Sequence, residues 1–60
     1  MKKKILIIDD DPIIGFVCRR LLDKHGYETD LASDGAIGIE RIPIFQPDLV
    51  FLDVIFIVKF

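Results

Sequence analysis

Several features that would assign this chain to a specialised class are absent from its sequence. Cys18 is the only cysteine, so an internal disulfide bond is impossible and we expect a reducing, cytoplasmic location. A formal net charge of −2 provides no basic surface, and we expect no nucleic-acid partner. The apolar residues 5–8 end at three aspartates and are too few for the core of a signal peptide. Residues 49–60 are apolar but fall short of the ~20 residues that span a membrane, so no membrane partner is expected.

The sequence does contain enough apolar material for one small globular domain. Hydrophobic residues make up 52% of the 60 residues and charged residues 30%, a composition typical of folded rather than disordered chains. A domain of this size buries only about 60% of the surface that its unfolded chain exposes, so its stability is marginal. We therefore expect a single domain over residues 1–60.

Two runs of large apolar residues, 5–8 and 49–52, each end directly before an aspartate. Consecutive apolar residues cannot alternate between a buried and an exposed face. Each run therefore predicts a strand that is covered on both faces, as in a parallel sheet between helices. In residues 27–31, by contrast, acidic residues alternate with Tyr, Thr and Leu, which predicts a half-exposed strand at an edge of the sheet.

The interval after the first strand predicts a helix with recognisable ends. Asp11 followed by Pro12 indicates the start, with aspartate as the N-cap and proline at the first helical position. Gly26 indicates the end, and His25 before it is interpreted as a solvated helix end rather than a catalytic residue. Cys18 is interpreted as a buried, unreactive thiol. It belongs to an apolar stripe at helical spacing: Ile14, Val17, Cys18 and Leu21.

The interval after the second strand predicts a shorter helix. It follows the loop at residues 33–35, and Pro43 lets it run no further than Ile42. The order is therefore strand, helix, strand, helix, strand, which implies an α/β fold with a parallel sheet and right-handed crossovers. We expect the two apolar strands side by side and the alternating strand at the edge, in the order 2-1-3, with the helices on opposite faces.

Aspartates follow both apolar strands at the points where the strands end. Ligands of open α/β sheets bind at the carboxyl ends of the strands, and we expect Asp9, Asp10 and Asp53 to converge there. Carboxylates this close repel one another unless a cation lies between them, and a small set of oxygen ligands suits Mg²⁺. One carboxylate could then attack a phosphoryl group as a nucleophile. A simpler interpretation, that these are solvated loop acids, stays open at this point.

Four segments and their spacing resemble the receiver domains of response regulators in two-component signalling. The resemblance extends from residue 3 to about residue 55 and is carried by these segments: Ile5-Leu6-Ile7-Ile8-Asp9-Asp10-Asp11-Pro12, Gly26-Tyr27-Glu28, Ala32-Ser33-Asp34-Gly35 and Pro47-Asp48-Leu49-Val50-Phe51-Leu52-Asp53-Val54. It implies a flavodoxin-like fold, of which residues 1–60 would form a truncated (βα)2β part with strands one to three, two helices and no output domain.

The resemblance also implies a site. Asp53 resembles the phosphoryl-accepting aspartate, which also contacts the metal, and Asp10 resembles a direct Mg²⁺ ligand. Asp9 would act on the Mg²⁺ through water, and the backbone carbonyl of Ile55 resembles a further ligand. The phosphoryl donor would be a sensor histidine kinase, and the chain itself would not be an enzyme.

The family pattern is incomplete in this sequence. No residue matches the family's switch Ser or Thr or its lysine, and Lys59 lies too close to Asp53 to take the role of that lysine. Gly38 and Ile37 are minor departures in the second helix. The abrupt change after Ile55 predicts a truncated or frame-disrupted receiver, or a chain that was cut at this point. Because the loss of one preorganised positive group commonly costs about 10²–10³ in rate, we expect Mg²⁺ binding but little or no phosphorylation.

Three functional interpretations therefore remain. The first is a receiver that accepts a phosphoryl group on Asp53 with Mg²⁺. The second is a switch-incompetent half-receiver that mainly self-associates through the exposed third strand, because residues 49–60 are rich in strand-forming apolar residues and nearly uncharged. The third, a flavodoxin-like nucleotide or flavin binder, has little support, because no glycine-rich phosphate loop follows the first strand.

Overall fold

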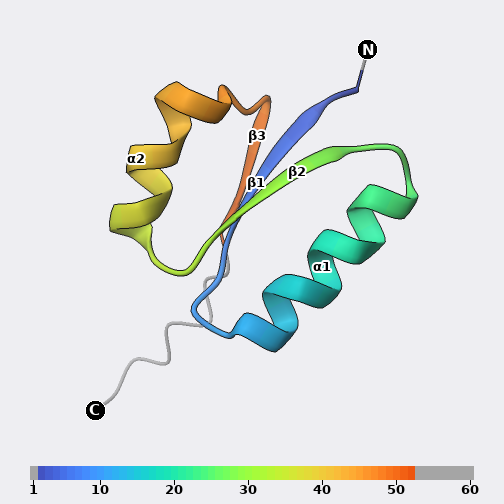
Figure 1. Cartoon of the computed structure of the whole chain (residues 1–60), viewed down its shortest axis with the longest axis horizontal. Coiled ribbons are helices and arrows are strands. Elements are labelled where there is room, and N and C mark those ends of the chain that lie inside the picture. The colour runs from blue at the N-terminus through green and yellow to red at the C-terminus, as the bar shows by residue number, and fades with distance from the viewer. Residues whose placement is uncertain (1, 53–60) are drawn as a thin grey trace.

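The computed structural model describes residues 2–52 of the chain. Its elements follow the predicted order: β1 (Lys4–Ile8), α1 (Pro12–Lys24), β2 (Glu28–Ala32), α2 (Gly35–Phe45) and β3 (Leu49–Leu52). The three strands form one parallel sheet in the order β2-β1-β3, and the two helices cover opposite faces of it (Figure 1). The predicted α/β fold, a truncated flavodoxin-like (βα)2β arrangement with sheet order 2-1-3, is confirmed.

β1 lies at the centre of the sheet and supplies most of the core. Its residues Leu6 and Ile7 are fully buried. Ile8, the last residue of the strand, is in register with Ala32 of β2 on one side and with Leu52 of β3 on the other. A strand paired on both edges and covered on both faces matches the continuous apolar run that predicted it.

Both predicted ends of α1 are confirmed. The Oδ1 atom of Asp11 accepts hydrogen bonds from the backbone N–H groups of Ile13 (2.9 Å) and Ile14 (3.3 Å), which otherwise lack partners at a helix start. At the other end Gly26 has a φ of +90°, a left-handed conformation that glycine adopts without strain. His25 is exposed at the helix end, as interpreted from the sequence.

Two glycines let the helices lie close to the sheet. A Cβ atom on Gly15 of α1 would lie 2.9 Å from Cδ1 of Leu31 in β2. A Cβ atom on Gly38 of α2 would lie 2.9 Å from Cγ1 of Ile8 in β1. Carbon atoms in favourable contact are about 3.5–4.0 Å apart, so a side chain at either position requires its neighbour to move. Both glycines, which look unfavourable for helices in the sequence, therefore allow the close approach of helix and sheet that the structure shows.

The predicted end of α2 at Ile42 is wrong, because the helix continues through Pro43 to Phe45. Gln46 then takes a left-handed conformation with a φ of 53°, and its N–H donates to the Ile42 carbonyl over 2.8 Å. Lys4 of β1 holds the last turn, because its Nζ donates to the Phe45 carbonyl over 3.3 Å and lies 5.4 Å from the centroid of the Phe45 ring. A tertiary contact thus outweighs the local preference of the residue before a proline.

β2 and α1 show smaller differences from the prediction. β2 begins at Glu28, one residue later than expected, and its mixture of buried and exposed residues confirms a half-exposed edge strand. The predicted apolar stripe of α1 is only partly covered: Leu21 is 53% exposed, and Cys18 is half-buried rather than buried. Neither described helix is long and apolar enough to cross a membrane.

The prediction that the third strand is covered on both faces is also wrong. The exposed fractions of its residues run from 39% to 56%: Leu49, Val50, Phe51 and Leu52. β3 lies at the outer edge of the sheet beside β1, and within residues 2–52 both helices pack on β1 and β2 instead (Figure 1). The position of the helices, rather than the composition of the strand, decides its burial.

Candidate functional site

The three aspartates after β1 lie in three different environments. Asp9 is 4% exposed, and its N–H donates to the Ala32 carbonyl of β2 over 3.0 Å, so the hydrogen-bond ladder continues one residue beyond β1. The Oδ1 atom of Asp9 accepts a hydrogen bond of 2.8 Å from the N–H of Asp11, whose own side chain caps α1. Asp10 lies between them and is exposed. Only Asp10 therefore fits the description of a solvated loop acid.

A small recess of about 60 Å³ opens beside this turn at the carboxyl end of the sheet. Its lining comes from the ends of β1 and β3 and the start of α2: Ile8, Asp9, Asp10, Ser33, Asp34, Gly35 and Leu52. A wider depression of about 360 Å³ shares part of this lining: Asp9, Asp10, Pro12, Leu31, Ser33 and Ile37. None of the lining residues that the structure describes is basic, so both hollows suit a cation better than an anion.

Ser33 and Asp34 are site residues that the sequence reasoning treats only as loop. Asp34 is the N-cap of α2, and its Oδ1 accepts a hydrogen bond of 2.8 Å from the N–H of Ile37. The parallel order β2-β1-β3 places the carboxyl end of β2 next to that of β1, which brings the loop after β2 to the acidic turn. The signal that could have found them is this strand order combined with the Asp-Gly helix start.

The described part of β3 ends beside the acidic turn. Leu52 is in register with Ile8, the residue that precedes Asp9. Asp53 and Ile55, the predicted phosphoryl acceptor and carbonyl ligand, lie outside the described residues. Over residues 2–52 no group of three or more His, Cys, Asp or Glu side chains is arranged to hold a metal ion. Of the predicted site, the structure places only Asp9 and Asp10 together.

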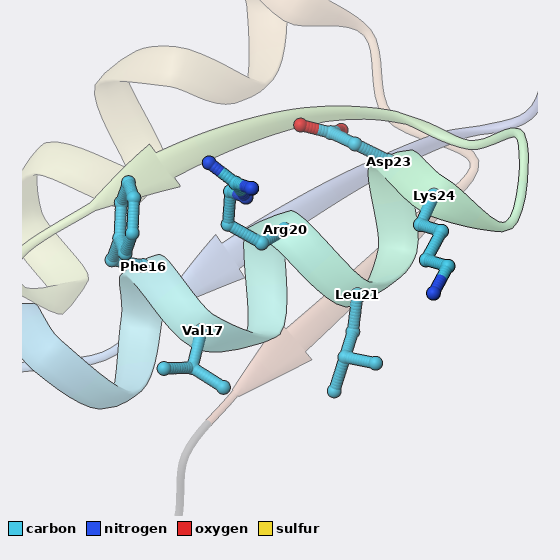
Figure 2. Close-up of a pocket in the computed structure, with 6 residues that line it drawn as sticks. All are labelled: Phe16, Val17, Arg20, Leu21, Asp23 and Lys24. Atoms are coloured by element: carbon cyan, nitrogen blue, oxygen red, sulfur yellow. The ribbon is translucent and has the colours of Figure 1, made fainter.

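A separate depression of about 610 Å³ lies on α1, away from the acidic turn. Its lining residues all come from the helix: Phe16, Val17, Arg20, Leu21, Asp23 and Lys24. Figure 2 shows Phe16 and Arg20 on one side of the helix and Val17 and Leu21 on the other. The Arg20 guanidinium lies 5.7 Å from the centroid of the Phe16 ring, within the range of a cation–π contact. The lining residues of this depression include no histidine, no cysteine and no pair of carboxylates, so they do not form a catalytic cluster.

The fold and the acidic turn after β1 agree with a comparison to known protein families. The sequence profile of the family described as "Response regulator receiver domain" matches residues 5–56. The chain belongs to this family. Receiver domains act in two-component signalling, and the predicted resemblance is therefore confirmed. The match includes Asp53 and Ile55, the two predicted site residues that the structure does not describe.

Individual relatives support the same family. The alkaline phosphatase synthesis transcriptional regulatory protein PhoP of Bacillus subtilis is 39% identical over 54 residues, which cover 90% of this chain and 22% of that protein. Response regulator MprA of Mycobacterium ulcerans is 41% identical over 54 residues, with coverage of 90% and 23%. Protein Rrf1 of Nitratidesulfovibrio vulgaris is 36% identical over 53 residues, with coverage of 88% and 38%. The chain spans between 22% and 38% of the length of these relatives, and no solved structure gives a significant match.

Proposed function

We propose that this receiver sequence accepts a phosphoryl group on Asp53 in a two-component system. Mg²⁺ would be held by Asp10, Asp53 and the backbone carbonyl of Ile55, with Asp9 acting through a bound water molecule. The observation that carries the proposal is the acidic turn after β1, which lies beside the last described residue of β3. Asp53 is the next residue in the sequence.

The described residues suit Mg²⁺ in two respects. Asp9 and Asp10 offer carboxylate oxygens, the ligands that this ion prefers, at the edge of the sheet where ligands of open α/β folds bind. Among the residues that the structure describes, no ion pair joins either carboxylate to a basic side chain. The hydrogen bond from the Asp11 N–H also fixes the orientation of the buried Asp9 carboxylate. Within residues 2–52, negative charge is therefore gathered there without a basic side chain to balance it.

The proposed reaction is a transfer of one phosphoryl group. A carboxylate oxygen of Asp53 forms a bond to phosphorus while the bond between phosphorus and the donor atom breaks, and the product is an acyl phosphate. Bound Mg²⁺ would neutralise charge on the phosphoryl oxygens. We propose a sensor histidine kinase as the donor, so that the bond that breaks is the phosphorus–nitrogen bond of a phosphohistidine. The chain acts as acceptor rather than as an enzyme, and we propose that it works in the cytoplasm.

Metal binding and intact mass test this proposal. Calorimetry should detect Mg²⁺ binding that Asp10→Ala abolishes and that Glu40→Gln, a change at an exposed residue of α2, leaves intact. A small-molecule phosphodonor with Mg²⁺ should add one phosphoryl group to only a small fraction of molecules, because no residue among the 60 matches the family's lysine or hydroxyl group. Asp53→Asn should receive none. A phosphoryl group that persists in Asp53→Asn, or Mg²⁺ binding that survives in Asp10→Ala, would contradict the proposal.

A second candidate function is self-association through β3. The specific observation that favours it is the exposure of all four residues of this strand, from 39% to 56%, although each is a large apolar residue. In this case the chain would be a switch-incompetent half-receiver that mainly self-associates. Sedimentation velocity tests this candidate by itself, since phosphoryl transfer makes no demand on the oligomeric state, and a folded monomer at all concentrations would contradict it.

A further inference from the structure

We propose that the outer edge of β2 is closed to the addition of another strand by three charged side chains, Arg19 of α1, Asp30 of β2 and Arg41 of α2. Within residues 2–52, β2 pairs with β1 alone, so its other edge carries no strand. An open strand edge is a template for pairing with a further strand, and natural proteins protect such edges with charged side chains. The hydrogen bonds around this edge identify which groups are protected.

The pairing of β2 with β1 decides which backbone groups of β2 face outward. The N–H of Glu28, the first residue of β2, donates to the Lys3 carbonyl over 2.9 Å. At the other end of the strand, the Ala32 carbonyl accepts from the N–H of the residue that follows β1, over 3.0 Å. The backbone groups of these two residues of β2 therefore point toward β1. Because the pattern alternates along a strand, those of Thr29 and Leu31 point to the outer edge.

One outward carbonyl and one outward N–H are already bonded to side chains. Nη2 of Arg19 donates to the Thr29 carbonyl over 3.4 Å, and Nε of the same arginine donates to Thr29 Oγ1 over 3.2 Å. The Leu31 N–H donates to Oδ1 of Asp30 over 3.0 Å. Oδ2 of that carboxylate accepts from Arg41 Nε over 2.6 Å. An incoming strand must displace these partners before it forms its own hydrogen bonds with β2.

The protecting side chains are held in place from both faces of the sheet. α1 and α2 pack on opposite faces of β2, and each supplies one of the two arginines (Figure 1). The Asp30 side chain is only 19% exposed, so its carboxylate lies against the protein rather than in open water. A charge left without a partner between two paired strands is unfavourable. Strand addition therefore has to break the contacts of both helices with the edge.

Amide hydrogen exchange of the 60-residue chain and of Asp30→Ala tests the protection of the Leu31 N–H. Removal of the acceptor should speed exchange of this amide at least about threefold relative to the amide of Ala32, which points toward β1 and is the internal reference. Glu40→Ala removes an exposed carboxylate of α2 and is the control, which should leave the ratio unchanged. The same ratio in the parent and in Asp30→Ala would overturn the proposal at this residue.

Sedimentation of a variant without the two arginines tests the consequence for strand addition. The variant Arg19→Met with Arg41→Met removes both donors, and it should associate with itself at least about tenfold more strongly than a matched control. The control, Arg20→Met with Lys24→Met, removes the same two positive charges and adds the same two apolar side chains at exposed positions of α1. Neither control position donates a hydrogen bond to β2 among the described residues.

The comparison with the control isolates the β2 edge. Association through β3 would raise both variants alike, so only the difference between them bears on this proposal. Far-UV circular dichroism shows whether both variants are folded, and the exchange measurement needs no substitution of an arginine. Equal association of the two folded variants would overturn the closure of the edge. Phosphorylation of Asp53 is read by mass and is independent of either outcome.

Discussion

Of the two edge strands, β2 is the more polar and yet the more buried, whereas β3 is apolar and exposed. β2 has the sequence ETDLA with two acidic residues, yet Thr29 is 8% and Ala32 is 1% exposed. β3 has the sequence LVFL, yet no residue in it is less than 39% exposed. Both strands pair in parallel with β1, and both helices pack on β2 but not on β3 within the described range. Burial at a sheet edge therefore depends on where the helices lie.

Polar contacts anchor the helices over β2. Thr29 Oγ1 donates to Asp23 Oδ1 of α1 over 2.6 Å and accepts from Arg19 Nε over 3.2 Å. On the opposite face Arg41 Nε of α2 donates to Asp30 Oδ2 over 2.6 Å. Two successive residues of β2 thus anchor one helix on each face. The apolar side chains of β3 offer no partner for contacts of this kind.

A substitution in β1, the strand that pairs with both edge strands, should cause the largest loss of stability. Ile7 is fully buried and is in register with Leu31 of β2 and Phe51 of β3. Ile7→Ala should cost about 2–5 kcal/mol, because it removes buried methyl groups and leaves a cavity, and a domain this small has little stability to lose. Urea unfolding followed by circular dichroism measures the change. Ile13→Ala, at a side chain that is 74% exposed, is the control and should unfold close to the parent midpoint.

Removal of the Thr29 hydroxyl, which joins β2 to α1, should cause the next largest loss of stability. Thr29→Val keeps the shape of the side chain but removes the hydroxyl that joins Asp23 and Arg19, and the loss of such hydrogen bonds between partly exposed groups costs about 0.5–1.5 kcal/mol. Thr29→Ser keeps the hydroxyl and should recover most of the loss. The free energy of unfolding in urea is the measurement. Equal losses in the valine and serine variants would show that the hydrogen bonds do not anchor α1.

The ion pair on the other face of β2 should contribute less. The Arg41 and Asp30 side chains are 38% and 19% exposed, so water screens their attraction. Arg41→Met should cost about 0.2–1 kcal/mol at low ionic strength and less in high salt. A double-mutant cycle with Asp30→Asn isolates the coupling between the two residues. A coupling that does not change with salt would contradict an electrostatic anchor.

The smallest effect is expected at the matching position of β3. Leu49 and Thr29 are both in register with Ile5 of β1, so they occupy equivalent places on the two edges. Leu49 is 56% exposed, and Leu49→Ala should change the free energy of unfolding by about 0.5 kcal/mol or less at a dilution where the chain is monomeric. If Leu49→Ala lowered the free energy of unfolding as much as truncation of a buried leucine does, β3 would be covered in solution. The contrast between the two edge strands would then disappear.

Part of the candidate site could be predicted from the sequence. The apolar run of β1 followed by aspartates correctly located Asp9 and Asp10 at the carboxyl end of the sheet. The burial of Asp9 could not be predicted, because it depends on how closely the ends of β1 and β2 approach. Ser33 and Asp34 in the same recess were missed, although the predicted strand order places the loop after β2 beside the end of β1. The predicted roles of Asp53 and Ile55 remain predictions.

The sequence by itself determined the order of the elements, the ends of α1 and the parallel sheet order. These features follow from signals within a few residues, such as the Asp11 cap and the apolar run of β1, or from the strand–helix alternation. Only the tertiary structure decided that α2 passes Pro43, that Gly15 and Gly38 contact the sheet, and that β2 rather than β3 is covered. Each of these depends on residues distant in the chain, as when Lys4 binds a carbonyl 41 positions away, and no local pattern records such contacts.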